Sequence, residues 1–206
     1  MSSEENRYPL IPVTFSSDWD FNDHAATFGI EMSLIHNVFI RGLNSIWYHA
    51  PLVKKADAIS FAGYSLTWVI LIHDHHHGEE EIVFPFLQAK FNMGDNVEQH
   101  AAFLKELNAF EEYMTGVFKN KETYDGEKVR GLVEAFGDTL VNHLHEEIPT
   151  IAPERLSQYE KKELDAMIDA HSAHIKSQPL TTAFALVGTH HDFKTFPSWS
   201  FGLFAT

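Results

Sequence analysis

The chain has 206 residues, of which 44% are hydrophobic, and this is enough to build a folded domain with a sizeable core. Its 15 basic and 29 acidic residues give a formal net charge of −14, which disfavours nucleic acid and anionic membranes as partners. The absence of cysteine excludes disulfides, thiolate metal sites and cysteine nucleophiles.

No segment reads as an export signal or a membrane anchor. The first residues, MSSEENRYPLIPVTF, lack the basic and apolar regions of a signal peptide. The longest apolar stretch, 61–72, is interrupted and too short to span a bilayer. We therefore expect a soluble cytoplasmic protein with no membrane partner.

The apolar residues repeat with a period near 3.6, so helices are predicted and sheet is not. Four long helices with short connections predict an all-α, up-and-down four-helix bundle. An additional C-terminal helix and an irregular tail follow, and residues 1–206 are expected to form one domain. The predicted helices are about 23–48, 60–91, 97–119, 127–148 and 157–176; the bundle core is about 23–152, and the C-terminal helix and tail are 153–206.

The second helix contains WVILIHDHHHGEEEIVFPF, residues 68–86, in which titratable side chains interrupt an apolar run. His75 and Glu79 are four residues apart and therefore share one face of the helix. Leu71, Ile82 and Phe86 continue the same stripe, so the pair is predicted to face the core. His76 and Glu80 flank this pair, whereas His77 and Glu81 lean further toward solvent.

The fourth helix contains a second His-x-x-x-Glu pair, within the segment GDTLVNHLHEEIPT. His143 and Glu147 are four apart on a stripe that also contains Phe136 and Leu140. A single His-x-x-x-Glu pair is ordinarily part of a solvated helix face. Two such pairs on inward faces of separate helices are far more specific for a metal site.

The first and third helices each add one histidine beside apolar residues, namely His36 and His100. Neutral imidazoles and carboxylates suit iron, manganese or zinc, and two carboxylates able to bridge provide for two metal ions. Burying these groups without a metal would be costly. The predicted donor set is His36, His75, Glu79, His100, His143 and Glu147.

The motifs LIHNVFIRGLN, HDHHHGEEEIVFP, VEQHAAF and HLHEEIP, spread over about 23–149, resemble those of the hemerythrin-like (HHE cation-binding) family. They are similar to the single-domain hemerythrin-like proteins of fungi. The resemblance implies a bundle that holds two non-haem iron ions, with the six donors above as ligands and Glu79 and Glu147 as bridges. Manganese and zinc are the alternative metals.

One position departs from the pattern of the oxygen carriers, which place a second histidine four residues after the one matching His100. Leu104 stands there in this chain. The resemblance therefore implies that one iron lacks an imidazole, and that its coordination position is open or is filled by water, substrate or a neighbour such as His76. This favours activation of dioxygen or peroxide, with a small organic substrate, over reversible oxygen carriage. His73, His76 and Glu80 are candidates for additional ligands or for groups that hold the ligands.

Two other functions are considered. One is an iron- or oxygen-responsive bundle without turnover, so whether the chain is an enzyme stays open, as do its catalytic residues. The other is a metal phosphohydrolase of the HD type, suggested by His73-Asp74 after His36. The His-x-x-x-Glu pairs and the scarcity of basic residues disfavour that class. His171 and His174 are predicted to be solvated, and His190 and His191 to lie in the irregular tail.

Overall fold

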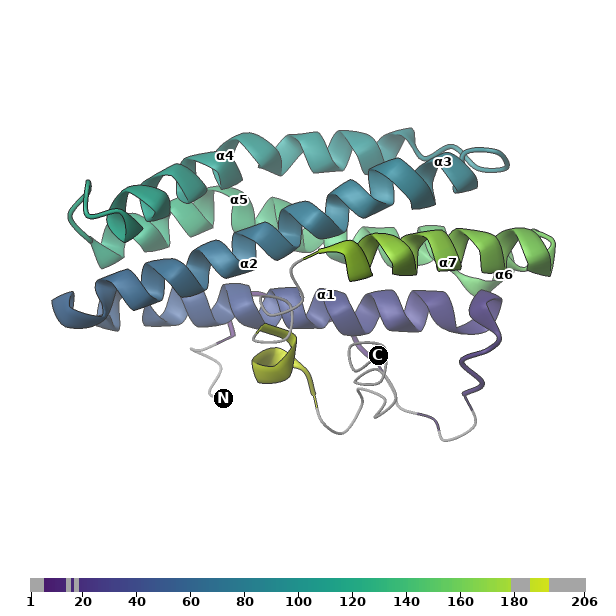
Figure 1. Cartoon of the computed structure of the whole chain (residues 1–206), viewed down its shortest axis with the longest axis horizontal. Coiled ribbons are helices and arrows are strands. Elements are labelled where there is room, and N and C mark those ends of the chain that lie inside the picture. Colours follow the sequence, from purple (N-terminus) through teal and green to yellow (C-terminus); the bar gives the residue numbers. More distant parts are fainter. Residues whose placement is uncertain (1–5, 14–15, 17–18, 179–185, 193–206) are drawn as a thin grey trace.

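The computed structural model describes residues 6–13, 16, 19–178 and 186–192, and within these ranges the chain is helical, without strands. Long rods formed by α1, α2, α4 and α5 lie side by side, with α7 alongside α1 and α2 (Figure 1). The all-helical prediction is confirmed, whereas the predicted irregular tail lies mostly outside the described residues. The helices are α1 (His24–His49), α2 (Ala58–Gly78), α3 (Phe84–Leu87), α4 (Gly94–Phe118), α5 (Gly126–Glu147), α6 (Pro153–Leu156) and α7 (Lys161–Ser177).

Side-chain caps start two of the long helices. The carboxylate of Asp23 accepts a hydrogen bond from the backbone N–H of Ala26 at the start of α1. The carboxylate of Asp125 accepts from the backbone N–H groups of Glu127 and Lys128 at the start of α5. Such caps satisfy donors that have no partner inside the helix.

Two predicted helix starts are wrong by a few residues. The helix expected from 97 begins three residues earlier, at Gly94. The helix expected from 157 begins at Lys161, because Pro153 starts the separate short helix α6. Proline fits the first turn of a helix, where its missing N–H leaves no bond unmade.

A π-helical segment, Glu79–Val83, joins α2 to α3. The backbone N–H of Phe84 donates to the carbonyl of Glu79, five residues earlier, so this turn holds one residue more than an α-helical turn. The extra residue rotates the following side chains. Val83, Phe84 and Leu87 are therefore buried, and the predicted core positions Ile82 and Phe86 are only partly so.

The apolar core consists of two clusters that the polar donors separate. Along α1, Phe28 and Met32 belong to one cluster and residues 38–46 to the other, with His36 between them. The cluster of residues 38–46 also includes the core residues of α2, α4 and α5, whereas the cluster of Phe28 and Met32 continues after α2 at residues 83–87, before α4 at Met93 and after α5 at Ile151. The candidate donors thus occupy one level across all four long helices, with apolar packing on both sides.

Close contact between α1 and α2 depends on Gly42 and Trp68. The indole N–H of the fully buried Trp68 donates to the carbonyl of Phe39 at 3.0 Å. A Cβ atom on Gly42 would lie 2.6 Å from the Trp68 ring, which is closer than two carbon atoms can pack. A residue without a side chain is therefore required at this crossing.

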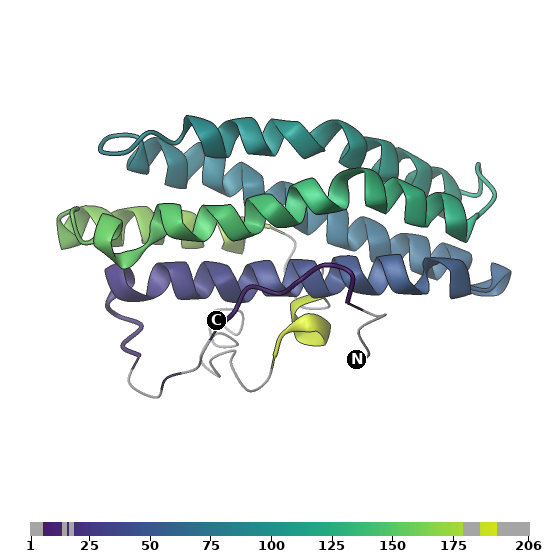
Figure 2. The same ribbon diagram turned by 180° about the vertical axis from the view of Figure 1, so that it is seen from behind.

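An N-terminal strap, residues 6–13, runs along α1 and α5 (Figure 2). Asn44 of α1 accepts a hydrogen bond from the backbone N–H of Tyr8 and donates to its carbonyl. Asn37 forms the same pair of bonds with the backbone of Ile11. The strap was not predicted, because it has no periodic pattern of its own.

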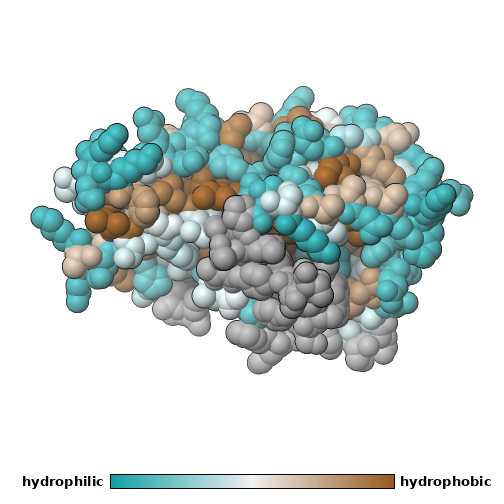
Figure 3. Space-filling model, viewed as in Figure 1, coloured by the Kyte–Doolittle hydropathy of each residue, from teal (hydrophilic) through white to brown (hydrophobic). Residues whose placement is uncertain are grey.

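The continuous helical stretch Lys55–Leu87 is long and apolar enough, by length and composition alone, to cross a membrane. The core helix of a water-soluble protein passes the same test. Here the stretch supplies Trp68, Val69 and Ile72 to the bundle core and carries the inward His75 and Glu79. An apolar band on the visible face follows the first half of α2 (Figure 3).

Two glycines of α5 provide a test of the strap. Gly131→Ala adds a methyl group into open space and should raise the free energy of unfolding by about 0.5–1 kcal/mol, because alanine favours the helix. Gly137→Ala should lower it by about 1–3 kcal/mol, because the new Cβ would lie 2.2 Å from the Tyr8 hydroxyl. Urea unfolding of both variants measures this. Changes of the same sign would contradict the packing of Tyr8 on α5.

Candidate metal centre

The six predicted donors come together at the level where the four long helices separate the two apolar clusters. Each of α1 and α4 contributes one histidine, and the other two helices contribute the His-x-x-x-Glu pairs. Glu79 and Glu147 are fully buried, as is His36. The donors form two groups whose ligand atoms all lie within 4.8 Å of one another: His76, Glu79, His100 and His143 in the first, and His36, His75, Glu79 and Glu147 in the second.

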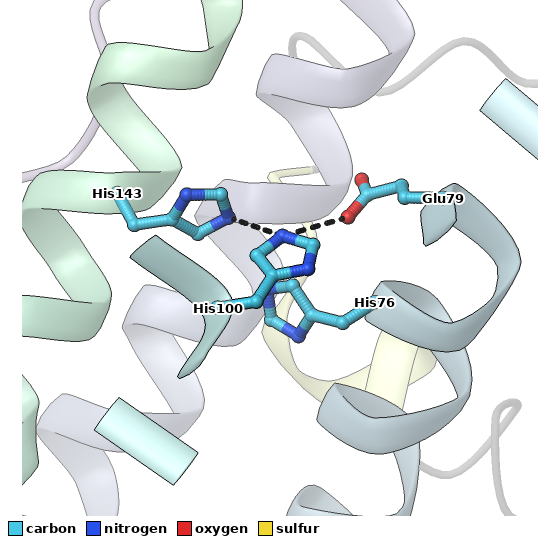
Figure 4. A group of neighbouring side chains, drawn as sticks. All are labelled: His76, Glu79, His100 and His143. Atoms are coloured by element: carbon cyan, nitrogen blue, oxygen red, sulfur yellow. Dashed lines mark hydrogen bonds and ion pairs between the residues drawn. The ribbon is translucent and has the colours of Figure 1, made fainter. Parts of the chain in front are cut away.

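The first group joins α2, α4 and α5 (Figure 4). The Nε2 atoms of His100 and His143 are 3.0 Å apart, and His100 Nε2 lies 3.6 Å from Oε2 of Glu79. His76 Nε2 is buried and has no hydrogen-bond partner among the described residues. Three imidazoles and one carboxylate therefore converge in this group.

The second group joins α1, α2 and α5. The Nε2 atoms of His36 and His75 are 3.0 Å apart, and His75 Nε2 lies 2.8 Å from Oε1 of Glu79. Oε2 of Glu147 lies 3.5 Å from His36 Nε2 and 3.8 Å from Nε2 of His143, which belongs to the first group. Glu79 is common to both groups, and Glu147 faces both.

Four of the inward imidazoles are oriented through their Nδ1 atoms. Each Nδ1 faces an oxygen that only accepts hydrogen bonds, so it carries the ring proton and leaves a lone pair on the inward Nε2. The acceptors are the Leu144 carbonyl for His36 (2.8 Å), the Ile72 carbonyl for His76 (2.7 Å), the Glu80 carboxylate for His100 (2.8 Å) and the Gln99 amide oxygen for His143 (3.1 Å).

This arrangement fits a pair of metal ions. The Nε2 lone pairs of His100 and His143 face each other at 3.0 Å, and a cation between them relieves the repulsion. None of the four carboxylate oxygens of Glu79 and Glu147 has a hydrogen-bond partner of good geometry. Neutral imidazoles around unpaired carboxylates are the donors that a divalent or trivalent cation binds.

Burial sets the protonation preferences of the same groups. Removal from water raises the pKa of Glu79 and of Glu147 well above the usual range. It lowers the pKa of His75 to about 3 and that of His36 well below its usual value. The imidazoles are therefore neutral at physiological pH and ready to coordinate, whereas the carboxylates need a cation to stay ionised.

The flanking residues take different roles in the structure. His76 is an inward donor from α2, and Leu104 is 42% exposed on the surface of α4. The third imidazole of the first group therefore comes from α2 and not from position 104 of α4. Glu80 holds His100 from outside. His73 Nε2 lies 3.2 Å from Oε2 of Glu111. Neither His73 nor Asp74 belongs to a donor group within the described part of the chain, so these residues do not support the HD-type phosphohydrolase hypothesis.

The prediction that His171 is solvated is wrong. His171 is buried, its ring contacts Phe28, and burial lowers its pKa to about 4. The reason is that α7 packs against α2 at Gly78. The Nε2 atoms of His171 and His174 lie 3.4 and 3.2 Å from the point where a Cβ on Gly78 would be. A glycine within a helix and two histidines three residues apart were the available signals.

Two other residues were not anticipated. Gln99 orients His143, but nothing in the sequence separates it from other polar residues on the outside of a helix. His190 belongs to a helical turn at 186–190, and its Nε2 lies 2.9 Å from the Tyr64 hydroxyl. This turn packs on the core through Leu186 and Val187, so the described part of the tail is not irregular.

Comparison with known proteins gives a family and one relative. The model of the hemerythrin HHE cation binding domain matches residues 34–155, a range that includes all the donors. The dimeric xanthone biosynthesis cluster protein R11 of Cryptosporiopsis sp. (strain 8999) is 33% identical over 178 residues, which is 84% of this chain. The chain spans 66% of the length of that relative. No solved structure matches significantly.

The contact of Glu80 with His100 can be tested with a neighbouring control. Glu80→Ala should weaken binding of one metal ion about tenfold, because His100 loses the acceptor that fixes its ring. Competition with a chromogenic chelator measures the affinity. Glu81→Ala removes the same charge from an exposed neighbour and should leave the affinity unchanged. Equal losses in both variants would assign the effect to charge alone.

Proposed function

Because the chain belongs to the hemerythrin HHE cation-binding domain family, we propose that it is a cytoplasmic non-haem di-iron protein that activates dioxygen or peroxide and oxidises a small organic substrate. The observation that carries the proposal is that Glu79 is common to two donor groups, as a carboxylate bridging two ions would be. The alternating order of the apolar clusters supports an up-and-down arrangement of the four long helices.

The two groups provide unequal surroundings. His76, His100 and His143 would hold one ion, and His36 and His75 the other, with Glu79 and Glu147 reaching both. Two bound irons supply the electrons that reduce dioxygen or peroxide. The second group offers one imidazole fewer than the first, so an oxidant or water would find room there.

The protein contributes orientation and the exclusion of water. The oxygens that accept hydrogen bonds from the Nδ1 atoms keep the ring protons away from the site. The inward Nε2 atoms therefore stay available to bind a metal ion. The apolar clusters on both sides keep water from the buried carboxylates. In such surroundings charges interact strongly, and a reactive group at the site would be shielded from side reactions with bulk solvent.

Two observations favour oxidation of a substrate over carriage of oxygen. The third imidazole of the first group comes from α2, which leaves α4 with an exposed leucine, Leu104, beside the site. The name of the relative assigns that protein to a cluster for biosynthesis of a dimeric xanthone, an organic product. By analogy, we propose a biosynthetic oxidation for this chain as well.

Metal analysis of single variants tests the proposal. The purified protein should contain about two irons per chain. His36→Ala and His143→Ala should each retain about one iron, because each removes a donor from one group only. Glu79→Ala should lose most of both. His73→Ala, outside both groups, should keep the full content.

The accompanying measurements separate the alternatives. Circular dichroism shows whether each variant remains helical, and consumption of peroxide or oxygen with an added reductant measures activity. Zinc alone, or no metal, in the purified protein would overturn the proposal. Two irons that change the melting temperature without any turnover would instead indicate a metal-responsive bundle.

A further inference from the structure

A pocket with a volume of about 370 Å³ lies between α2 and α4, beside the first donor group. Its α4 wall consists of Val97, Ala101 and Leu104, at spacings of four and three residues, so all three share one face of the helix. Val97 is 45% exposed and Leu104 is 42% exposed. Large apolar side chains left exposed around a hollow indicate a site that binds an apolar surface.

The α2 wall is polar. It consists of His73, His77 and Glu80. The side chain of Glu80 is 44% exposed, and one of its oxygens accepts the hydrogen bond from His100. A carboxylate has capacity for further hydrogen bonds, so Glu80 can accept one from a hydroxyl group in the pocket. His73 is held at the mouth by Glu111.

Phe103 connects the pocket to the metal centre. It lines the pocket together with His76 and His100, and its ring centroid is 5.1 Å from that of His76 and 6.2 Å from that of His100. A molecule in the pocket would therefore contact the outer edges of two donor imidazoles. These flat rings favour an aromatic ligand over an aliphatic one.

The charges select among aromatic ligands. Glu80 lines the pocket, Glu111 contacts the lining residue His73, and the whole chain has a formal net charge of −14. An anionic ligand would therefore be repelled. A neutral molecule can pack its apolar part on the α4 side of the pocket and donate a hydrogen bond to Glu80 on the other side.

We propose that this pocket binds a neutral, flat aromatic molecule of about two or three fused rings that carries a hydroxyl group, and presents it to the first donor group. The rings lie against Val97, Ala101 and Leu104, and the hydroxyl donates to Glu80. The role as substrate site rests on the proposed function, whereas the binding itself does not. Leu104 then determines which molecules reach the centre.

Calorimetric titration of the purified protein with 2-naphthol tests the pocket. Leu104→Trp fills it and should weaken binding at least about tenfold. Leu52→Trp makes the same change at a leucine that is 61% exposed and outside the pocket, and should leave the affinity within about twofold of the wild-type value. The iron content of both variants should remain that of the wild type.

Two further probes test the chemistry. The methyl ether 2-methoxynaphthalene cannot donate a hydrogen bond and should bind about fivefold more weakly than 2-naphthol. Naphthalene-2-sulfonate, an anion of similar shape, should not bind measurably. Unchanged affinity in Leu104→Trp, or tighter binding of the sulfonate, would overturn the inference. If the protein holds no iron but Leu104→Trp still weakens binding of 2-naphthol, the proposed function is wrong and the inference that the pocket binds an aromatic molecule is supported.

Discussion

The burial of Glu79 and Glu147 is the constraint on which the rest of the structure depends. An unpaired carboxylate costs several kcal/mol to remove from water, and here two of them face each other inside a bundle. Surrounding them with imidazoles repays that cost only when a cation completes the set. Three features favour a bound cation: the apolar clusters on both sides, the oxygens that accept from the Nδ1 atoms, and the placement of the metal-binding side chains at one height along the four helices.

The π-helical turn bears on this constraint directly, since Glu79 is its first residue. Below the turn, α2 presents His75 and His76 at positions set by ordinary helical spacing. After Glu79, the extra residue of the π-helical turn changes which side chains face the bundle core, so that Val83 and Phe84 are buried next to the site. The turn thus lets one helix change from donor to core within a few residues. Irregular turns of this kind are often found at functional sites.

Much of the fold and six of the donors could be predicted from the sequence, because a side chain four residues from another on an apolar stripe can face only one way. The reasoning failed where a contact depends on a partner far away in the chain. His171 is buried because α7 meets Gly78, and the spacing of His171 and His174 within α7 does not say which helix they pack against. His76, predicted from the sequence as a candidate to replace the missing imidazole, does lie in the first donor group.

The N-terminal strap has a consequence for the order of folding. Its backbone is bound by Asn37 and Asn44 of α1, while Tyr8 rests on Gly137 of α5, more than a hundred residues later. A contact between such distant parts of the chain has a high entropic cost and forms late. The strap precedes all four long helices in the chain, yet it is therefore among the last segments to become ordered. Asn37 adjoins His36, so the strap closes over the helix that supplies this donor only after α5 is in place.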